Sequence, residues 1–205
     1  MAKLDLNDIN QVYFDVLCEI GNIGTGNATT ALAQMLDCRV DMYVPQVRLL
    51  EFSEVGTIMG GEEQLMAGIY LAVEGDIDGS ILFLLEIESA HFLLEKIFKT
   101  PKTGNELTDM ESSALMEIGN IITGAYLNAL STMTGLRIEP SVPDLTIDMA
   151  GAILSVPAIE FSKISDKALL IETEFGDKDT IINGYFILIP TLDAFATIFS
   201  ALGLS

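Results

Sequence analysis

Two long stretches of the chain place their apolar residues at the spacing of an amphipathic helix, in which successive residues turn by about 100°. The apolar side of the first stretch consists of Phe14, Leu17, Ile20, Gly24, Ala28, Ala31, Leu32 and Met35. The apolar side of the second consists of Leu115, Ile118, Ile122, Tyr126, Ala129 and Met133. We therefore expect two long helices that pack on a core. Asp5 or Asn7 caps the first, which ends near Leu36. A capping box at residues 108–111 starts the second, which ends before Gly135.

The other apolar segments are short, and they predict strands joined by turns. Residues 38–50 (bent near Pro45), 65–73, 78–85, 136–147, 167–174 and 180–189 alternate or run apolar. Turns around Gly75 and Gly176 connect two pairs of these strands as hairpins. We expect shorter helices at 88–98, 148–155 and 191–202, and a loop with a helical turn at 51–60. Residues 99–106 then form the connector between two similar halves.

The two helical stretches are also copies of each other. Residues 19–45 and 117–143, aligned without a gap, are identical at 13 of 27 positions, and both begin Glu-Ile-Gly-Asn-Ile and end Val-Pro. A repeat of this length sets the architecture, but two copies are too few for a solenoid. We predict an α+β fold: a single, internally duplicated, pseudo-twofold domain spanning residues 1–205, with halves of about 1–103 and 104–205. A mainly antiparallel sheet is shared by both halves and covered by the two long helices.

The polar side of each long helix is unusual. It carries Asp15, Glu19, Asn22 and Gly26 in the first copy, and Ser113, Glu117, Asn120 and Gly124 in the second. A solvated helix surface normally carries Lys, Arg and Glu in pairs, whereas Asn and Gly are poor residues for a helix interior. Glu and Asn on a single helix usually have no more than a solvated or structural role. Their repetition on the same stripe favours a functional surface that another macromolecule approaches closely.

Composition narrows the class of partner. The chain has 10 Lys and Arg against 30 Asp and Glu, a net charge of −20, which repels nucleic acid and anionic lipid and favours a partner with a basic patch. The apolar runs are too short to span a membrane, and the first residues form no apolar signal-peptide region. We therefore expect a cytoplasmic protein in which Cys18 and Cys38 are reduced thiols.

Other common chemistries have little support in the sequence. The glycines at 21, 24 and 26 meet neither the Walker nor the dinucleotide-binding pattern and lie inside a helical stretch. His91 is the only histidine and lies in an apolar helical segment, so a catalytic triad is unsupported. No cluster of His and Cys residues predicts a metal site. The carboxylates and amides that remain supply no nucleophile and no evident base.

The spacing of the polar residues resembles a family signature. Asp or Ser, three residues, Glu, two residues, Asn, 22 residues and Pro is the pattern of the CheC/CheX/FliY phosphatases. The pattern fits twice, at Asp15, Glu19, Asn22 and Pro45 and again at Ser113, Glu117, Asn120 and Pro143. The length, the duplication and the order of elements resemble CheC in particular, so the resemblance covers nearly the whole chain.

The resemblance implies a phosphatase that removes the aspartyl phosphate of CheY-like response regulators in bacterial chemotaxis. It implies that Asn22 and Asn120 are catalytic residues, which enter the regulator's active site and orient the attacking water. No cofactor is expected on this chain, because the regulator itself holds Mg²⁺ and a lysine at its acyl phosphate. Only a water molecule placed in line is then needed, and an amide both donates and accepts hydrogen bonds.

The other motif residues have supporting roles in this interpretation. Glu19 and Glu117 form a salt bridge to the regulator's active-site lysine and fix the docked pose. Asp15 and Ser113 lie one turn earlier and are accessory. The proline of each copy, Pro45 or Pro143, shapes the chain beside its helix without touching the reaction.

Two alternatives stay open. The same acidic surface suits a non-catalytic module that sequesters the phosphorylated regulator, or the CheD receptor deamidase with which CheC-like proteins pair. The resemblance places CheD on the second half, near Asp148 or the last helix. A structural role at the flagellar switch, as in FliY, is the third interpretation, and the lack of an extra switch-binding domain in 205 residues argues against it.

Overall fold

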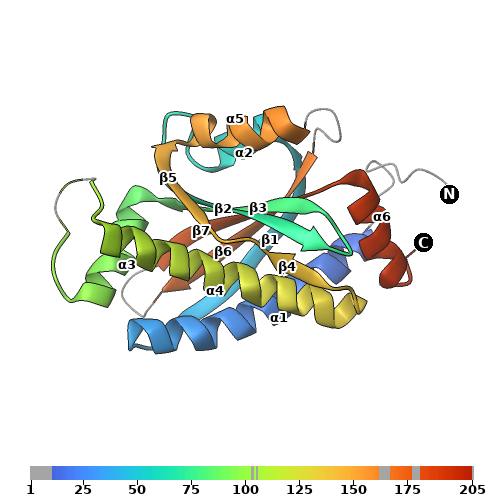
Figure 1. Cartoon of the computed structure of the whole chain (residues 1–205), viewed down its shortest axis with the longest axis horizontal. Helices are drawn as coiled ribbons and strands as arrows, with labels where there is room; N and C mark the ends of the chain where they lie inside the picture. The colour runs from blue at the N-terminus through green and yellow to red at the C-terminus, as the bar shows by residue number, and fades with distance from the viewer. Residues whose placement is uncertain (1–10, 103, 105, 162–166, 177–180, 205) are drawn as a thin grey trace.

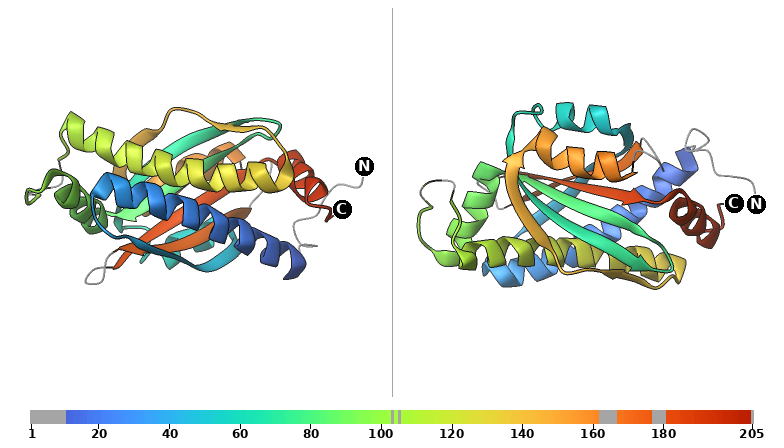
Figure 2. Two further views of the ribbon diagram at one scale, coloured as in Figure 1. Left: turned by 90° about the horizontal axis from the view of Figure 1, so that it is seen from below. Right: turned by 45° about the horizontal axis from the view of Figure 1, so that its top comes forward.

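A seven-stranded antiparallel sheet lies between two layers of helices in the computed structural model, which describes residues 11–102, 104, 106–161, 167–176 and 181–204. The long helices α1 (Gln11–Leu36) and α4 (Asp109–Thr134) run side by side in opposite directions over one face of the sheet (Figures 1 and 2). The short helices α2 (Phe52–Ile58) and α5 (Ala150–Phe161) cover the other face. Helices α3 (Ile87–Phe98) and α6 (Leu192–Ala201) lie at the two ends of the long pair. The predicted mixture of helices and antiparallel sheet is confirmed.

The order of strands in the sheet shows how the two halves combine. The path runs β1-β6-β7-β3-β2, and both β4 and β5 pair with β2 at the far edge. The bounds are β1 Asp41–Glu51, β2 Leu65–Gly75, β3 Gly79–Glu86, β4 Ile138–Pro140, β5 Asp144–Met149, β6 Lys167–Gly176 and β7 Ile181–Pro190. Strand β1 of the first half pairs with β6 of the second, and β5 of the second half pairs with β2 of the first. Each half therefore adds strands to the other, β1 to the second half and both β4 and β5 to the first, and β3 and β7 meet in the centre.

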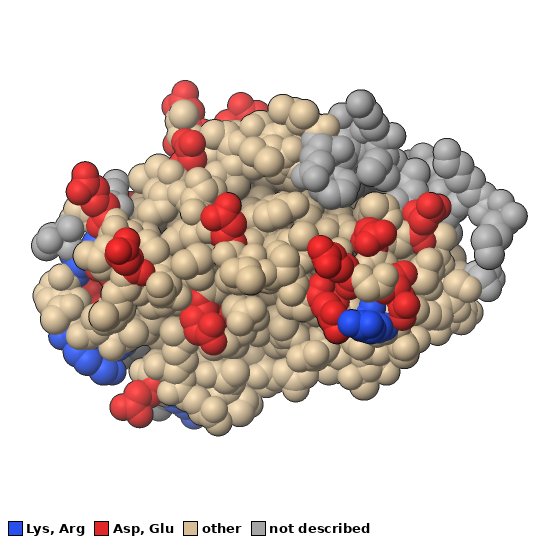
Figure 3. Space-filling model, viewed as in Figure 1, with Lys and Arg blue, Asp and Glu red and all other residues tan. Residues whose placement is uncertain are grey.

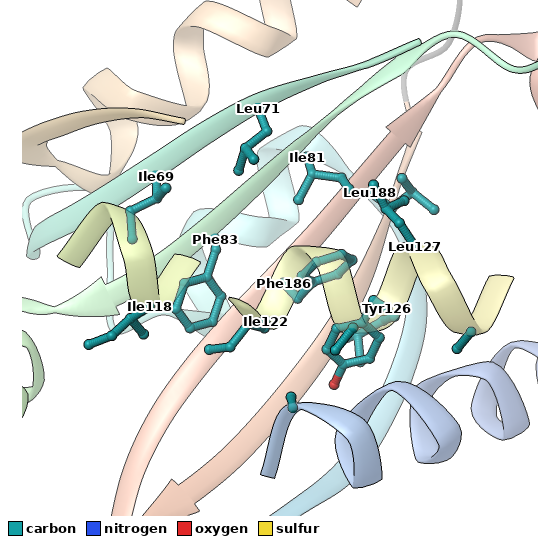
Figure 4. Close-up of a cluster of buried hydrophobic side chains, with 14 of the residues drawn as sticks. Ile69, Leu71, Ile81, Phe83, Ile118, Ile122, Tyr126, Leu127, Phe186 and Leu188 are labelled. Atoms are coloured by element: carbon teal, nitrogen blue, oxygen red, sulfur yellow. The ribbon is translucent and has the colours of Figure 1, made fainter. Parts of the chain in front are cut away.

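The core is densest between the long helices and the sheet. Ile118 and Ile122 of α4 are buried there near Phe83 and Phe186 of the central strands (Figure 4). Ile20 of α1 is buried in the same core. A second, smaller core on the opposite face joins α2 and α5 to the sheet. Because a strand alternates its side chains between the faces, the central strands supply both cores, which explains their nearly continuous apolar sequence.

The caps of α4 and the bend of β1 lie where the sequence predicts them. The Thr108 hydroxyl accepts a hydrogen bond from the Glu111 backbone N–H, and the Glu111 carboxylate accepts one from the Thr108 backbone N–H, which completes the capping box of α4. The hydrogen bonds that the Glu111 carboxylate accepts from the Thr108 backbone N–H and from the Thr108 hydroxyl lower the pKa of Glu111. Gly135 ends the helix with a φ of 72°. The predicted bend of β1 corresponds to a shift of register between Tyr43 and Gln46, which brackets Pro45.

Some predicted boundaries need correction. The helix predicted at 148–155 begins later and runs further, because Asp148 is still in β5, paired with Met66, and α5 continues through Pro157. The strand predicted at 136–147 is divided into β4 and β5 around residues 141–143. The segment expected to be mainly loop at 51–60 is largely the helix α2. The predicted cap of α1 at Asp5 or Asn7 and part of the second hairpin turn lie outside the described residues.

Candidate docking surface on the two long helices

The two long helices approach most closely where Gly24 of α1 meets Tyr126 of α4. A Cβ atom added at Gly24 would lie 2.7 Å from Cδ1 and 3.0 Å from Cα of Tyr126, so only glycine fits. The Tyr126 hydroxyl shares hydrogen bonds with the hydroxyls of Thr25, at 3.0 Å, and Thr173, at 3.2 Å. Burial raises the pKa of Tyr126, which stays a neutral phenol. This contact fixes α1, α4 and strand β6 relative to one another, and with them the two polar stripes.

The polar stripes lie on the outer side of the helix pair, as the periodicity predicts. Glu19, Asn22 and Glu117 are exposed, and Asn120 is half-buried. Among the described residues, these four side chains have no hydrogen bond, ion pair or other partner. A group on an exposed helix that lacks a partner within its own chain is available to another molecule. The structure therefore presents two separate carboxylate and amide pairs, one on each long helix.

The remaining predicted residues lie near these pairs in different ways. Asp15 and Ser113 are exposed one turn before Glu19 and Glu117. Partial burial raises the pKa of the Cys18 thiol, and the negative charge of the nearby Asp15 raises it further. Pro45 lies in the irregular part of β1, and Pro143 is half-buried between β4 and β5. The prolines therefore belong to the strand regions that follow the helices, and the stripes do not include them.

The charged side chains of the two long helices all have the same sign. Neither α1 nor α4 contains a Lys or an Arg. Figure 3 shows acidic side chains spread over the face seen in Figure 1, with few basic ones among them. Within the described ranges, no group of three or more His, Cys, Asp or Glu residues lies close enough to hold a metal ion. In the same ranges no helix is long and apolar enough to cross a membrane.

Sequence reasoning missed two features of the molecule. The first is the contact between Gly24 and Tyr126. The repeat contains a signal for it, because Gly24 aligns with the larger Ile122 in the second copy, and Tyr126 aligns with the smaller Ala28 in the first. The second is a groove of about 420 Å³ on the opposite face, between the sheet and α5. Its lining includes Asp148 and Val156, and no local pattern in the sequence predicts it.

Comparison with known proteins places the chain among its relatives. The model of the CheC-like family matches residues 15–48 and 110–147, which contain both copies of the motif from its first polar residue to its proline. The chain is 36% identical over 204 residues to the CheY-P phosphatase CheC of Bacillus subtilis, with 97% of this chain and 98% of the relative covered. The chain belongs to the CheC-like family.

Solved structures share the fold of this CheC-like protein. The crystal structure of Thermotoga maritima FliY matches with a TM-score of 0.75 and 19% identity, covering 96% of this chain and 98% of FliY. CheX in the CheX-CheY-BeF3-Mg²⁺ complex from Borrelia burgdorferi matches with a TM-score of 0.53 and 20% identity, covering 84% and 98%. At these identities the likeness concerns the fold, and it agrees with the duplicated α+β domain predicted from the sequence.

Proposed function

We propose that this CheC-like protein is a CheY-P phosphatase, which hydrolyses the aspartyl phosphate of a CheY-like response regulator in chemotaxis signalling. The observation that carries the proposal is the pair of outward stripes, each with a Glu and an Asn that lack partners in the described chain. The full-length relative in Bacillus subtilis is named for this activity, and the family model matches the segments that form both stripes.

The chemistry requires little of this chain. In the proposed reaction, Asn22 or Asn120 holds a water molecule in line with the acyl phosphate of the docked regulator. The water oxygen bonds to phosphorus, and the bond between phosphorus and the regulator's aspartate oxygen breaks, which releases inorganic phosphate. The regulator's own residues would hold Mg²⁺ at the acyl phosphate, where the ion would supply neutralisation of the developing charge. Glu19 and Glu117 pair with the regulator's lysine, so that each amide arrives in a fixed position.

The test is a turnover assay on a phosphorylated CheY-like regulator. The regulator is charged with acetyl phosphate, freed of excess donor, and mixed with a catalytic amount of the protein while acyl phosphate is measured. Each protein molecule should clear many equivalents of phosphorylated regulator, and the double variant Asn22→Ala/Asn120→Ala should clear none above the spontaneous rate. Full activity of that double variant would sink the proposal. Protection of the acyl phosphate by wild-type protein would support the sequestering alternative.

The CheD receptor deamidase is the second partner in this proposal, and we place it on the opposite face. Asp148 is exposed at the groove beside α5, and three neighbouring apolar side chains are also exposed: Met149 by 48%, Val156 by 61% and Ile159 by 73%. An apolar patch with a charged rim is typical of a protein interface. Val156→Asp should abolish CheD binding in a pull-down while leaving turnover of the regulator unchanged, and retained binding would remove CheD from this face.

A further inference from the structure

Four of the glycines inside the two long helices fall into two groups. Gly24 and Gly119 are required by packing, since a Cβ would lie 2.7 Å from Tyr126 Cδ1 in the first case and 2.6 Å from Ile69 Cγ2 in the second. Gly26 and Gly124 are different, because a Cβ at either position meets nothing within 4 Å. Neither of these two has a positive φ, so the backbone does not require glycine either. The fold itself gives no reason for glycine at these two positions.

Glycine nevertheless occupies both positions, although it is the least favourable helix residue after proline. The two positions are equivalent in the repeat, and neighbours that differ between the copies, such as Asn27 and Ala125, show that the repeat has diverged around them. A residue that lowers helix stability without an intramolecular role, twice at the same place, points to a requirement outside the chain.

The position of these glycines identifies that requirement. Gly26 and Gly124 lie four residues after Asn22 and Asn120, which is about 6 Å along the helix and about 40° around it. The Cα–Cβ bond in a helix tilts toward the N-terminus, so a side chain at either glycine would cover the surface beside the asparagine. Any molecule that receives the asparagine in its active site must approach this surface closely.

We propose that Gly26 and Gly124 provide steric clearance for the response regulator and are specificity-determining residues of the docking surface. This inference rests on the proposed function and deepens it. The glycines touch no reacting atom, and the absence of a side chain lets the rim of the regulator's active site reach the helix backbone. A side chain at these positions blocks the docked pose and leaves the chemistry of a molecule that does dock unchanged.

The experiment compares two double variants with two controls. Gly26→Ala/Gly124→Ala should raise the melting temperature by roughly 4–8 °C, because alanine favours the helix. The same variant should raise KM for the phosphorylated regulator by about tenfold and change kcat by less than about twofold, because uniform binding is lost. Gly26→Gln/Gly124→Gln should raise KM further while keeping a melting temperature above that of wild type. The control Asn27→Ala/Thr132→Ala alters exposed residues about 100° away from the stripes, and it should raise the melting temperature without changing KM.

Each outcome decides the inference. An unchanged KM in both glycine variants, or a melting temperature below that of wild type, overturns it. Absence of turnover by wild-type protein is a failure of the proposed function, and the variants are then compared by their affinity for phosphorylated regulator. If the glycine variants bind phosphorylated regulator more weakly than wild type and the control does not, the steric-clearance role of the glycines is supported. Affinity equal to that of wild type, or no binding by wild type at all, overturns it.

Discussion

The two motif asparagines lie outside the core, so substitutions there test their proposed catalytic role separately from folding. Asn22 is exposed, and neither Asn22 nor Asn120 has a partner among the described residues. The periodicity of the sequence predicts this outward placement for both copies. It does not predict that Asn120 is half-buried, because that depends on how the neighbouring elements pack around α4.

Replacing either asparagine by alanine should therefore leave stability unchanged or raise it. Alanine is the better helix former, and the expected gain is roughly 0.5 kcal/mol for Asn22→Ala and smaller for the half-buried Asn120. Turnover should fall far more than regulator binding, because the lost interaction forms only on the way to the transition state. Thermal melts and steady-state assays on the two single variants measure both quantities. Clear destabilisation of both, with activity per folded molecule intact, would make these asparagines structural.

The proposed role of the motif glutamates leads to a separate prediction about binding of the regulator. Glu19 lies on a helix that carries no basic residue, so its proposed partner is the lysine of the regulator. Glu19→Lys should weaken association more than Glu19→Ala, because it replaces attraction by repulsion as well as removing the salt bridge. Association of the wild type should weaken as salt rises, because exposed charges are screened over about 10 Å at 0.1 M ionic strength. An affinity that stays flat between low and physiological salt would remove the salt bridge from the mechanism.

At the scale of elements, sequence reasoning succeeds where the signal is local. The long helices repeat their apolar positions over seven turns, and capping residues mark both ends of α4, with Thr108 at its start and Gly135 at its end. The start of α5 is missed because Asp148 continues the alternation of β5 up to the helix. The two predicted hairpins pair as expected, β2 with β3 and β6 with β7. The pairing of β1 with β6 is missed, because it joins residues that are far apart in sequence.

The crossing of α1 and α4 gives a prediction with an internal control. Gly24→Ala should destabilise the protein by about 1–3 kcal/mol, because the added methyl meets a Tyr126 ring whose hydroxyl is tied to two threonines. Gly26→Ala, two residues away with no atom within 4 Å of the new Cβ, should be stabilising. Thermal melts of the two variants should move in opposite directions. A rise for both would show that the helix pair separates easily at the crossing.

At the scale of the whole molecule, the exchange of strands makes the two halves interdependent. Residues 1–103 alone would leave β1 without β6, β2 without β5 and β3 without β7, and the core beneath the helices would lose one wall. We expect neither 1–103 nor 104–205 to unfold cooperatively on its own, and we expect a mixture of the two to regain the melting transition of the intact chain. Circular dichroism melts test this. A cooperative transition in either isolated half would contradict the interdependence.

The last feature is a hydrogen bond between the two ends of the described chain. The Tyr13 hydroxyl donates to the carbonyl oxygen of Leu204 at 2.6 Å, and the Tyr13 ring meets Phe199 edge-on. The end of α6 thus lies beside the start of α1, as the end of α3 is joined to the start of α4 by the connector. The covalent order of the halves is therefore interchangeable. A circular permutant opened within residues 99–106, with a linker from Leu204 to the start of α1, should therefore keep the strand pairs of the described chain, because the new junction joins elements that already lie side by side.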